Sequence, residues 1–120
     1  MSPTTQQLEA DDWVEYFDSL TERTAGALVT IEVMSEELGA QTEVERLPLQ
    51  TIGYDPKESI LEIAVGGRGL RYPVVLRHFI SSPQEISVEE EGSGPSALLV
   101  SDASGARTLI RLFAPTALET

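Results

Sequence analysis

Hydrophobic and polar residues change their spacing near residue 26 of the chain. Before it, Trp13, Phe17 and Leu20 are spaced i, i+4 and i+7, which places them on one stripe of a helix. Thr4 begins a capping-box spacing, and Gly26 is a residue type that commonly ends helices. The pattern predicts one amphipathic helix over residues 4–25, whose apolar stripe must be covered by the rest of the chain.

Residues 27–114 have the alternating pattern of an antiparallel meander. Apolar and polar residues alternate in "ALVTIEV", "ILEIAV" and "EISVEEE", and the stretches "SEELG", "DPKES", "GSGP" and "ASG" supply turns between such segments. Pro48 cannot donate a hydrogen bond to a sheet, so "LPLQTIGY" is predicted to be an edge, a bend or a strand end. Residues 115–120 are predicted to form a loose tail.

The predicted fold class is α+β. An antiparallel sheet with one apolar face needs a cover, and the N-terminal amphipathic helix is the one helix available. We therefore expect this helix to pack on a curled, mainly antiparallel sheet or partly open barrel of about six to seven strands. The length of 120 residues and the hydrophobic content of 41% are those of a single domain over residues 1–120 with its own core.

Composition narrows the chemistry of the protein. The formal net charge of −12 argues against nucleic-acid or anionic-membrane partners, since such binding relies on Lys and Arg. The absence of cysteine and the single histidine exclude most His/Cys metal sites, and no cofactor motif is present. With neither a basic, apolar leader nor a membrane-length apolar run, the sequence predicts a cytoplasmic protein without a metal or cofactor.

One basic stretch, residues 64–80, interrupts the acidic chain. It contains Arg68, Arg71, Arg77 and the single histidine, His78, and it has no acid. Its "GGRG" lacks the spacing of a phosphate loop and precedes a strand-like "LRYPVV", which favours a hairpin turn. The arginines are expected to pair with the protein's own carboxylates, with 36–37 and 89–91 as candidates. A small anionic ligand held by these arginines and His78 is the sharper alternative.

Strand parity gives an expectation for His78. Leu76, His78 and Ile80 share one face of the predicted strand, so His78 is predicted to belong to the core wall unless Pro73 breaks the alternation. Three aromatic residues, Trp13, Tyr54 and Tyr72, are candidates for a pocket or interface, although an aromatic stripe on a helix more often marks core.

The chain resembles a known family in "LVTIEVMSEELGAQTEVERLPLQTIGYD", together with "WVEYFDSL" and "SALLVSDASGARTLIRLF". These strings are similar to the small acidic bacterial proteins grouped as domain of unknown function 5335, over roughly residues 12 to 114. The resemblance implies a stand-alone single domain and brings no activity, cofactor or active-site residue. The segment around Arg68 and Arg71 departs from the more acidic loop of that family.

Three functional hypotheses follow from the sequence. The first is a noncatalytic binding or scaffolding module that binds another protein or forms a homodimer through a sheet edge, with "ALLV" and "YPVVL" as candidate edges. The second is a small-ligand or anion-binding protein that uses Arg68, Arg71 and Arg77. The third is a carboxylate-based hydrolase, which no catalytic motif supports.

Overall fold

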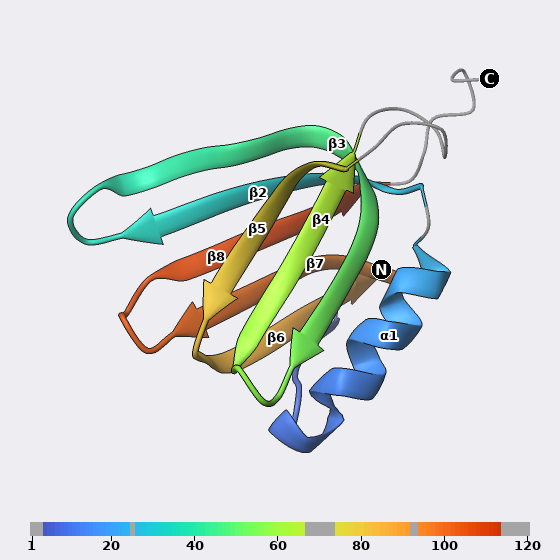
Figure 1. The fold of residues 1–120 in the computed structure, drawn as a ribbon, viewed down its shortest axis with the longest axis horizontal. Coiled ribbons are helices and arrows are strands. Elements are labelled where there is room, and N and C mark those ends of the chain that lie inside the picture. The colour runs from blue at the N-terminus through green and yellow to red at the C-terminus, as the bar shows by residue number, and fades with distance from the viewer. Residues whose placement is uncertain (1–3, 25, 67–73, 92–93, 114–120) are drawn as a thin grey trace.

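The computed structural model describes residues 4–24, 26–66, 74–91 and 94–113, apart from the side chains of residues 74 and 75. Over these residues the protein is one antiparallel sheet with one α-helix (Figure 1). The elements are β1 (Thr4–Gln7), η1 (Ala10–Asp12), α1 (Trp13–Arg23), β2 (Leu28–Ser35), β3 (Gly39–Asp55), β4 (Ile60–Gly66), β5 (Val74–Ser81), β6 (Pro83–Glu91), β7 (Gly94–Asp102) and β8 (Arg107–Phe113). The strand order is β1-β6-β7-β8-β2-β3-β4-β5, and the α+β class is confirmed.

The strand count and the start of the helix differ from the sequence prediction. The described chain has eight strands rather than six or seven, because Thr4–Gln7 forms β1 and pairs with Ser87–Glu90 of β6 instead of beginning the helix. These four polar residues have no apolar face to bury, and their backbone satisfies the outer edge of β6. The helix begins at Trp13 and ends at Arg23, so it covers half of the predicted range of 4–25.

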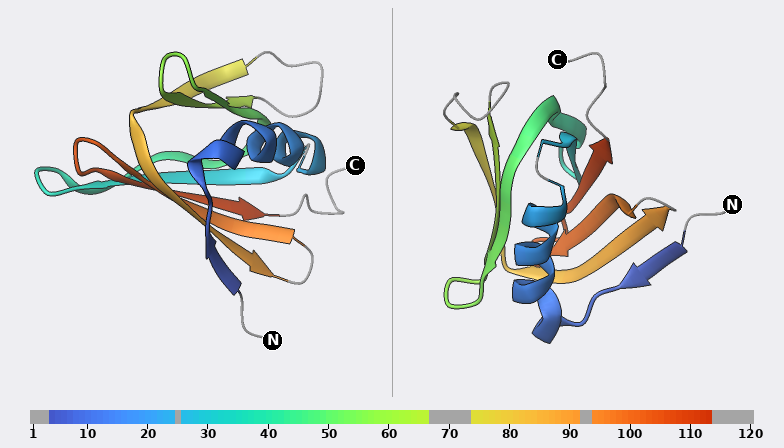
Figure 2. Two further views of the ribbon diagram at one scale, coloured as in Figure 1. Left: turned by 90° about the horizontal axis from the view of Figure 1, so that it is seen from below. Right: turned by 90° about the vertical axis from the view of Figure 1, so that its right-hand side faces the viewer.

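The long strand β3 changes partners along its length. Gly39–Pro48 pairs with β2, whereas Leu49–Asp55 pairs with β4. Arg46 has a φ of 52°, and register shifts flank the change of partner. The predicted irregularity around Pro48 is therefore a bend within one strand, and it turns β4 and β5 away from the plane of β2, β8 and β7 (Figure 2).

A single residue, Ser82, joins β5 to β6. Its φ of 53° turns the chain sharply, its N–H donates to the Ser59 carbonyl at 2.7 Å, and its carbonyl accepts the Ala103 N–H at 3.0 Å. β5 is the last strand at one end of the sheet, and β6 is next to last at the other end. Such a short link is feasible because the sheet curls until its two ends approach each other at this corner, without closing (Figures 1 and 2).

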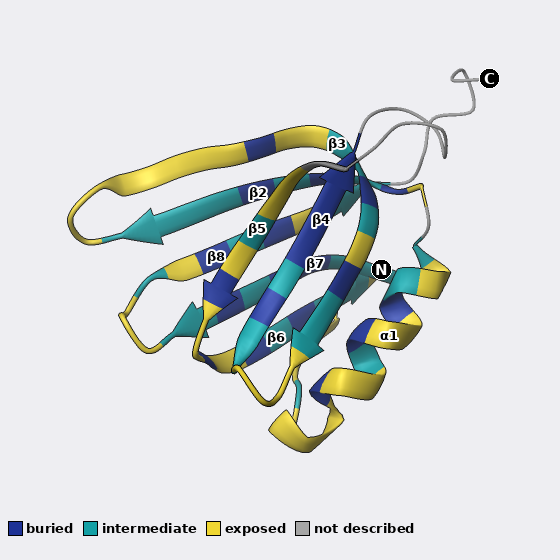
Figure 3. Ribbon diagram, viewed as in Figure 1, coloured by how far each residue is buried: buried dark blue, intermediate teal, exposed yellow. Residues whose placement is uncertain are grey.

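The core lies inside the curl. β4 contributes Leu61, Ile63 and Val65, and every other described strand except β1 contributes at least one buried apolar residue (Figure 3). The predicted helical stripe of Trp13, Phe17 and Leu20 is confirmed, and each of these side chains is buried. Each fully buried large apolar side chain contributes about 1.5–3 kcal/mol relative to an exposed one, so the stripe alone is a substantial part of the core.

Helix α1 occupies the place of a strand beside the second half of β3. β2 ends its pairing with β3 at Leu28, and the Leu49 N–H donates to the Ala27 carbonyl at 2.8 Å. Beyond this point β3 has α1 rather than a strand on this side. The Thr21 hydroxyl donates to the Ile52 carbonyl at 2.8 Å and accepts the Ile52 N–H at 3.0 Å. One side chain thereby satisfies both edge groups of Ile52 and fixes the helix against the sheet.

Replacing Thr21 by valine should destabilise the fold at this edge. Thr21→Val keeps the shape of the side chain but removes the partner of the Ile52 N–H and C=O, and we expect a loss of about 1–2 kcal/mol in the free energy of unfolding. Thr24→Val is the matched control, because the Thr24 hydroxyl donates to the Leu20 carbonyl, which already accepts the Thr24 N–H. Urea denaturation measures both variants, and equal losses would contradict the role of Thr21.

Candidate functional site

The strand β5 is an end strand of the described sheet, and its two faces differ. His78 lies opposite Ile63 and Phe79 lies opposite Glu62 in the β4–β5 register. Since directly paired residues of an antiparallel ladder point to the same face, His78 belongs to the inner face and Arg77 and Phe79 to the outer face. The expected parity of His78 with Ile80 is confirmed, with His78 half-buried and Ile80 buried.

The Arg77 guanidinium is paired on the outer face. Its Nη1 lies 2.8 Å from Glu62 Oε2 on the neighbouring strand. The expected partners at 36–37 and 89–91 are wrong for this arginine, because Glu62 is its diagonal cross-strand neighbour. Such an exposed pair contributes about 0–1 kcal/mol.

The predicted anion site is described only in part. Arg77 and His78 lie on opposite faces of β5, so these two side chains do not converge on one ligand. Arg68 and Arg71, like the "GGRG" turn and Tyr72, fall in residues 67–73, outside the described residues. The anion site formed with these arginines stays a prediction.

His78 lies in an environment that disfavours its charged form. Burial on the inner face lowers the pKa of His78 below its ordinary value, and the Glu43 carboxylate opposes that effect. The imidazole is therefore neutral at pH 7, as suits a side chain on the wall of the core.

The predicted aromatic site is divided between core and surface. Trp13 is 4% exposed and packs edge-to-face on Tyr54, with ring centroids 5.1 Å apart. Trp13 Nε1 is buried and has no hydrogen-bond acceptor among the described residues. Trp13 is therefore a core residue. Tyr54 packs against the core and in addition lines a hollow at the surface.

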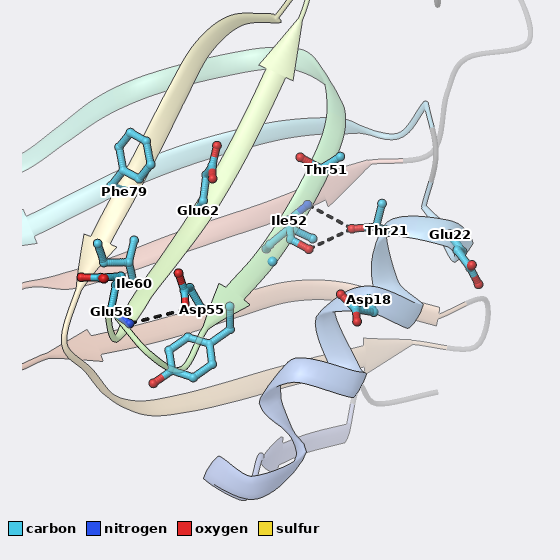
Figure 4. A pocket seen from close by; sticks show the side chains of 12 residues that line it. Asp18, Thr21, Glu22, Thr51, Ile52, Asp55, Glu58, Ile60, Glu62 and Phe79 are labelled. Carbon is cyan, nitrogen blue, oxygen red and sulfur yellow. Dashed lines mark hydrogen bonds between the residues drawn. The ribbon is translucent and has the colours of Figure 1, made fainter.

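This hollow has a volume of about 710 Å³ and lies between α1 and β5, across β3 and β4 (Figure 4). Thr51 and Gly53 of β3 and Ile60 of β4 line it, together with Phe79 at the β5 side. Five carboxylates also line it, from α1, the end of β3, the β3–β4 turn and β4: Asp18, Glu22, Asp55, Glu58 and Glu62. We call this surface the acidic trough.

Two of these carboxylates already have partners. Asp55 Oδ1 accepts the backbone N–H of Lys57 at 2.9 Å and that of Glu58 at 3.4 Å, which holds the turn between β3 and β4. Glu62 is paired with Arg77. In the described part of the chain, no group of three or more His, Asp or Glu side chains is placed to hold a metal ion.

Sequence reasoning missed several residues of these surfaces. Phe79 was not among the candidate site residues, but its side chain is 54% exposed and lies at the β5 side of the trough. The expectation that "ALLV" forms an edge is wrong, because β7 is paired on both sides by β6 and β8. The other candidate, "YPVVL", lies partly on the end strand β5.

Comparison with known proteins assigns the chain to a family. The family described as "Family of unknown function (DUF5335)" matches residues 4–120. The chain belongs to the DUF5335 family. An uncharacterized protein of Aquifex aeolicus (strain VF5) is similar to this DUF5335 protein, with 34% identity over 108 residues that cover 90% of this chain and 91% of the relative. No solved structure matches the chain.

The resemblance inferred from the sequence is thus confirmed, and the family brings no activity to this DUF5335 protein. The described part of the chain contains no helix with the length and apolar character that crossing a membrane would require. A function must therefore be inferred from the surfaces of this protein rather than from its relatives.

The lowered pKa of His78 predicts a pH dependence of stability for this DUF5335 protein. The unfolded imidazole binds a proton more tightly than the folded one, so the contribution of His78 is complete above its unfolded pKa of about 6.5 and decreases as the pH falls toward the folded pKa. We expect wild-type protein to lose stability relative to His78→Gln between about pH 7.5 and pH 5.5.

Urea unfolding of dilute wild-type and His78→Gln protein at each pH measures this difference, and the subtraction removes the carboxylate titrations that both share. A difference that stays constant, or that changes in favour of the wild type on acidification, would contradict the burial of His78.

Proposed function

We propose that this protein is a noncatalytic interaction module that forms a homodimer by pairing its β5 edge with the β5 edge of a second copy. The supporting observation is that β5 ends the described sheet and carries two exposed apolar side chains, Leu76 at 38% and Phe79 at 54% exposure. An end strand leaves backbone N–H and C=O groups without strand partners, and these groups can pair with another strand. The lack of cysteine suits a reducing compartment such as the cytoplasm.

The opposite end of the sheet is less suited to pairing. β1 is four residues long, and its sequence is the polar "TTQQ" with every side chain exposed. Short polar end strands are a common way of preventing edge-to-edge association. β5 has eight residues and apolar side chains, so it is the edge that favours a partner.

Side-chain parity restricts the register of such a dimer. Two antiparallel β5 strands related by a two-fold axis must pair residues of the same face. One residue must therefore lie directly opposite its own copy, with the axis between the two. An axis at Arg77 would oppose two guanidinium groups. An axis at His78 places Leu76 opposite Ile80 of the partner and Arg77 opposite Phe79 of the partner, where a cation–π contact of about 0.5–1 kcal/mol can form twice.

We expect the protein to dimerise with a roughly micromolar dissociation constant, because one strand pair buries less area than a standard interface. The double variant Leu76→Lys with Phe79→Lys should remain monomeric, since lysines on an edge strand block pairing. Val14→Lys with Leu38→Lys is the matched control, because both residues are exposed and the charge change is the same.

Sedimentation equilibrium over a concentration series measures the mass of each variant against the 13.1 kDa chain. Wild-type protein that stays monomeric at high concentration would overturn the proposal, and so would equal dissociation of both double variants.

Single cysteines test the register, because the chain has none of its own. Under mild oxidation, His78→Cys should form a disulfide-linked dimer fastest, since the two Cβ atoms meet at the axis. Phe79→Cys should form it more slowly. Non-reducing electrophoresis follows both rates, and faster linkage of Phe79→Cys would place the axis elsewhere.

A further inference from the structure

The outer face of β3, β4 and β5 is a sheet face that no other described element covers. Helix α1 packs against the edge and inner side of β3, where Trp13, Phe17 and Leu20 enter the core. On the outer side, the acidic trough remains open between Asp18 and Glu22 of the helix and Phe79 of β5 (Figure 4). This face meets the β5 edge of the proposed dimer at Phe79, whereas the floor of the trough on β3 and its carboxylates lie outside that edge.

A glycine keeps the floor of the trough open. Gly53 lies in the interior of β3 opposite Glu62, and its φ is outside the positive range that favours glycine. A Cβ built at Gly53 would have no atom within 4 Å, so no close packing requires a glycine there either. Glycine in a strand interior lowers stability and often marks a place where another molecule approaches closely.

The charge of the trough is one-sided. Its described lining contains five carboxylates and no lysine or arginine, and Arg77 at its border is paired with Glu62. At the β5 side of this surface lies the exposed ring of Phe79. The trough is therefore complementary to a partner that carries positive charge together with an apolar group.

We propose that the acidic trough docks a basic segment of a partner protein, with lysine or arginine side chains against Glu22 and Glu58 and an apolar side chain against Phe79. Several partners are disfavoured by charge. A second copy of a chain with a net charge of −12 would bring the same carboxylates to this face, and nucleic acids or anionic lipids would be repelled. A basic protein segment satisfies both the charge and the exposed ring.

The probe for this surface is a lysine-rich peptide with one central phenylalanine, titrated into ¹⁵N-labelled full-length protein. We expect shift changes centred on Thr51, Gly53 and Ile60, with an affinity that decreases as salt is added. Glu22→Gln with Glu58→Gln should weaken binding roughly three- to tenfold, because two exposed charge pairs are lost. Glu36→Gln with Glu37→Gln removes the same charge at the β2–β3 turn and should have little effect.

Gly53→Leu tests the floor without changing charge or the β5 edge. It should abolish peptide binding while the mass measured by sedimentation stays that of the wild type, and Ala40→Leu on the exposed β2–β3 hairpin is the control for added bulk. Full binding to Gly53→Leu, or shift changes centred on another face, would overturn the proposal.

Two ligand controls test the chemistry of the partner. Binding of spermine, or of the peptide with acetylated lysines, with the same affinity as the unmodified peptide would also overturn the proposal. A protein that binds the peptide but stays monomeric would contradict only the proposed dimer.

Discussion

The contact between the Thr21 hydroxyl and the backbone of Ile52 is the point on which the rest of the architecture depends. An open sheet that curls around a core has to satisfy the backbone of its bent strand where the first neighbour ends. In this protein a helix rather than a strand does so, and the same helix delivers Trp13, Phe17 and Leu20 to the core. The hydrogen bonds of Thr21 and the burial of these three side chains therefore act together in holding α1 against the sheet.

Blocking the edge of β3 has consequences for the surfaces of the molecule. With α1 beside β3 and the polar strand β1 on β6, the described sheet keeps one long apolar end strand, β5. The helix also forms one side of the acidic trough, because Asp18 and Glu22 follow the buried stripe on its solvent side. The helix thus forms one side of the outer hollow, and the strand order leaves β5 as the free edge of the described sheet.

Local sequence signals predicted much of this fold. The i, i+4, i+7 stripe of α1, the alternation in β4, the parity of His78 and the turns at "SEELG", "DPKES" and "ASG" are all present. Long-range pairing could not be predicted, because the polar residues Thr4–Gln7 become a strand only by contact with β6. The partner of Arg77 and the outward face of Gly53 likewise follow from register, which periodicity alone does not determine.

The stretch between Glu62 and Glu85 has no acidic residue, and it contains β5, the end strand of the described sheet. This position suggests a second explanation for its basic character. Two copies of a chain with a net charge of −12 repel each other over about a Debye length of 8 Å at physiological salt. Pairing is least opposed where carboxylates are absent and where Arg77 neutralises the neighbouring Glu62. The basic character of this segment is therefore as consistent with close approach of a second β5 strand as with capture of an anion. The acidic trough differs from this edge, because Asp18, Glu22 and Glu58 have no basic partner in the described part of the chain. It therefore favours a positively charged partner rather than a second copy.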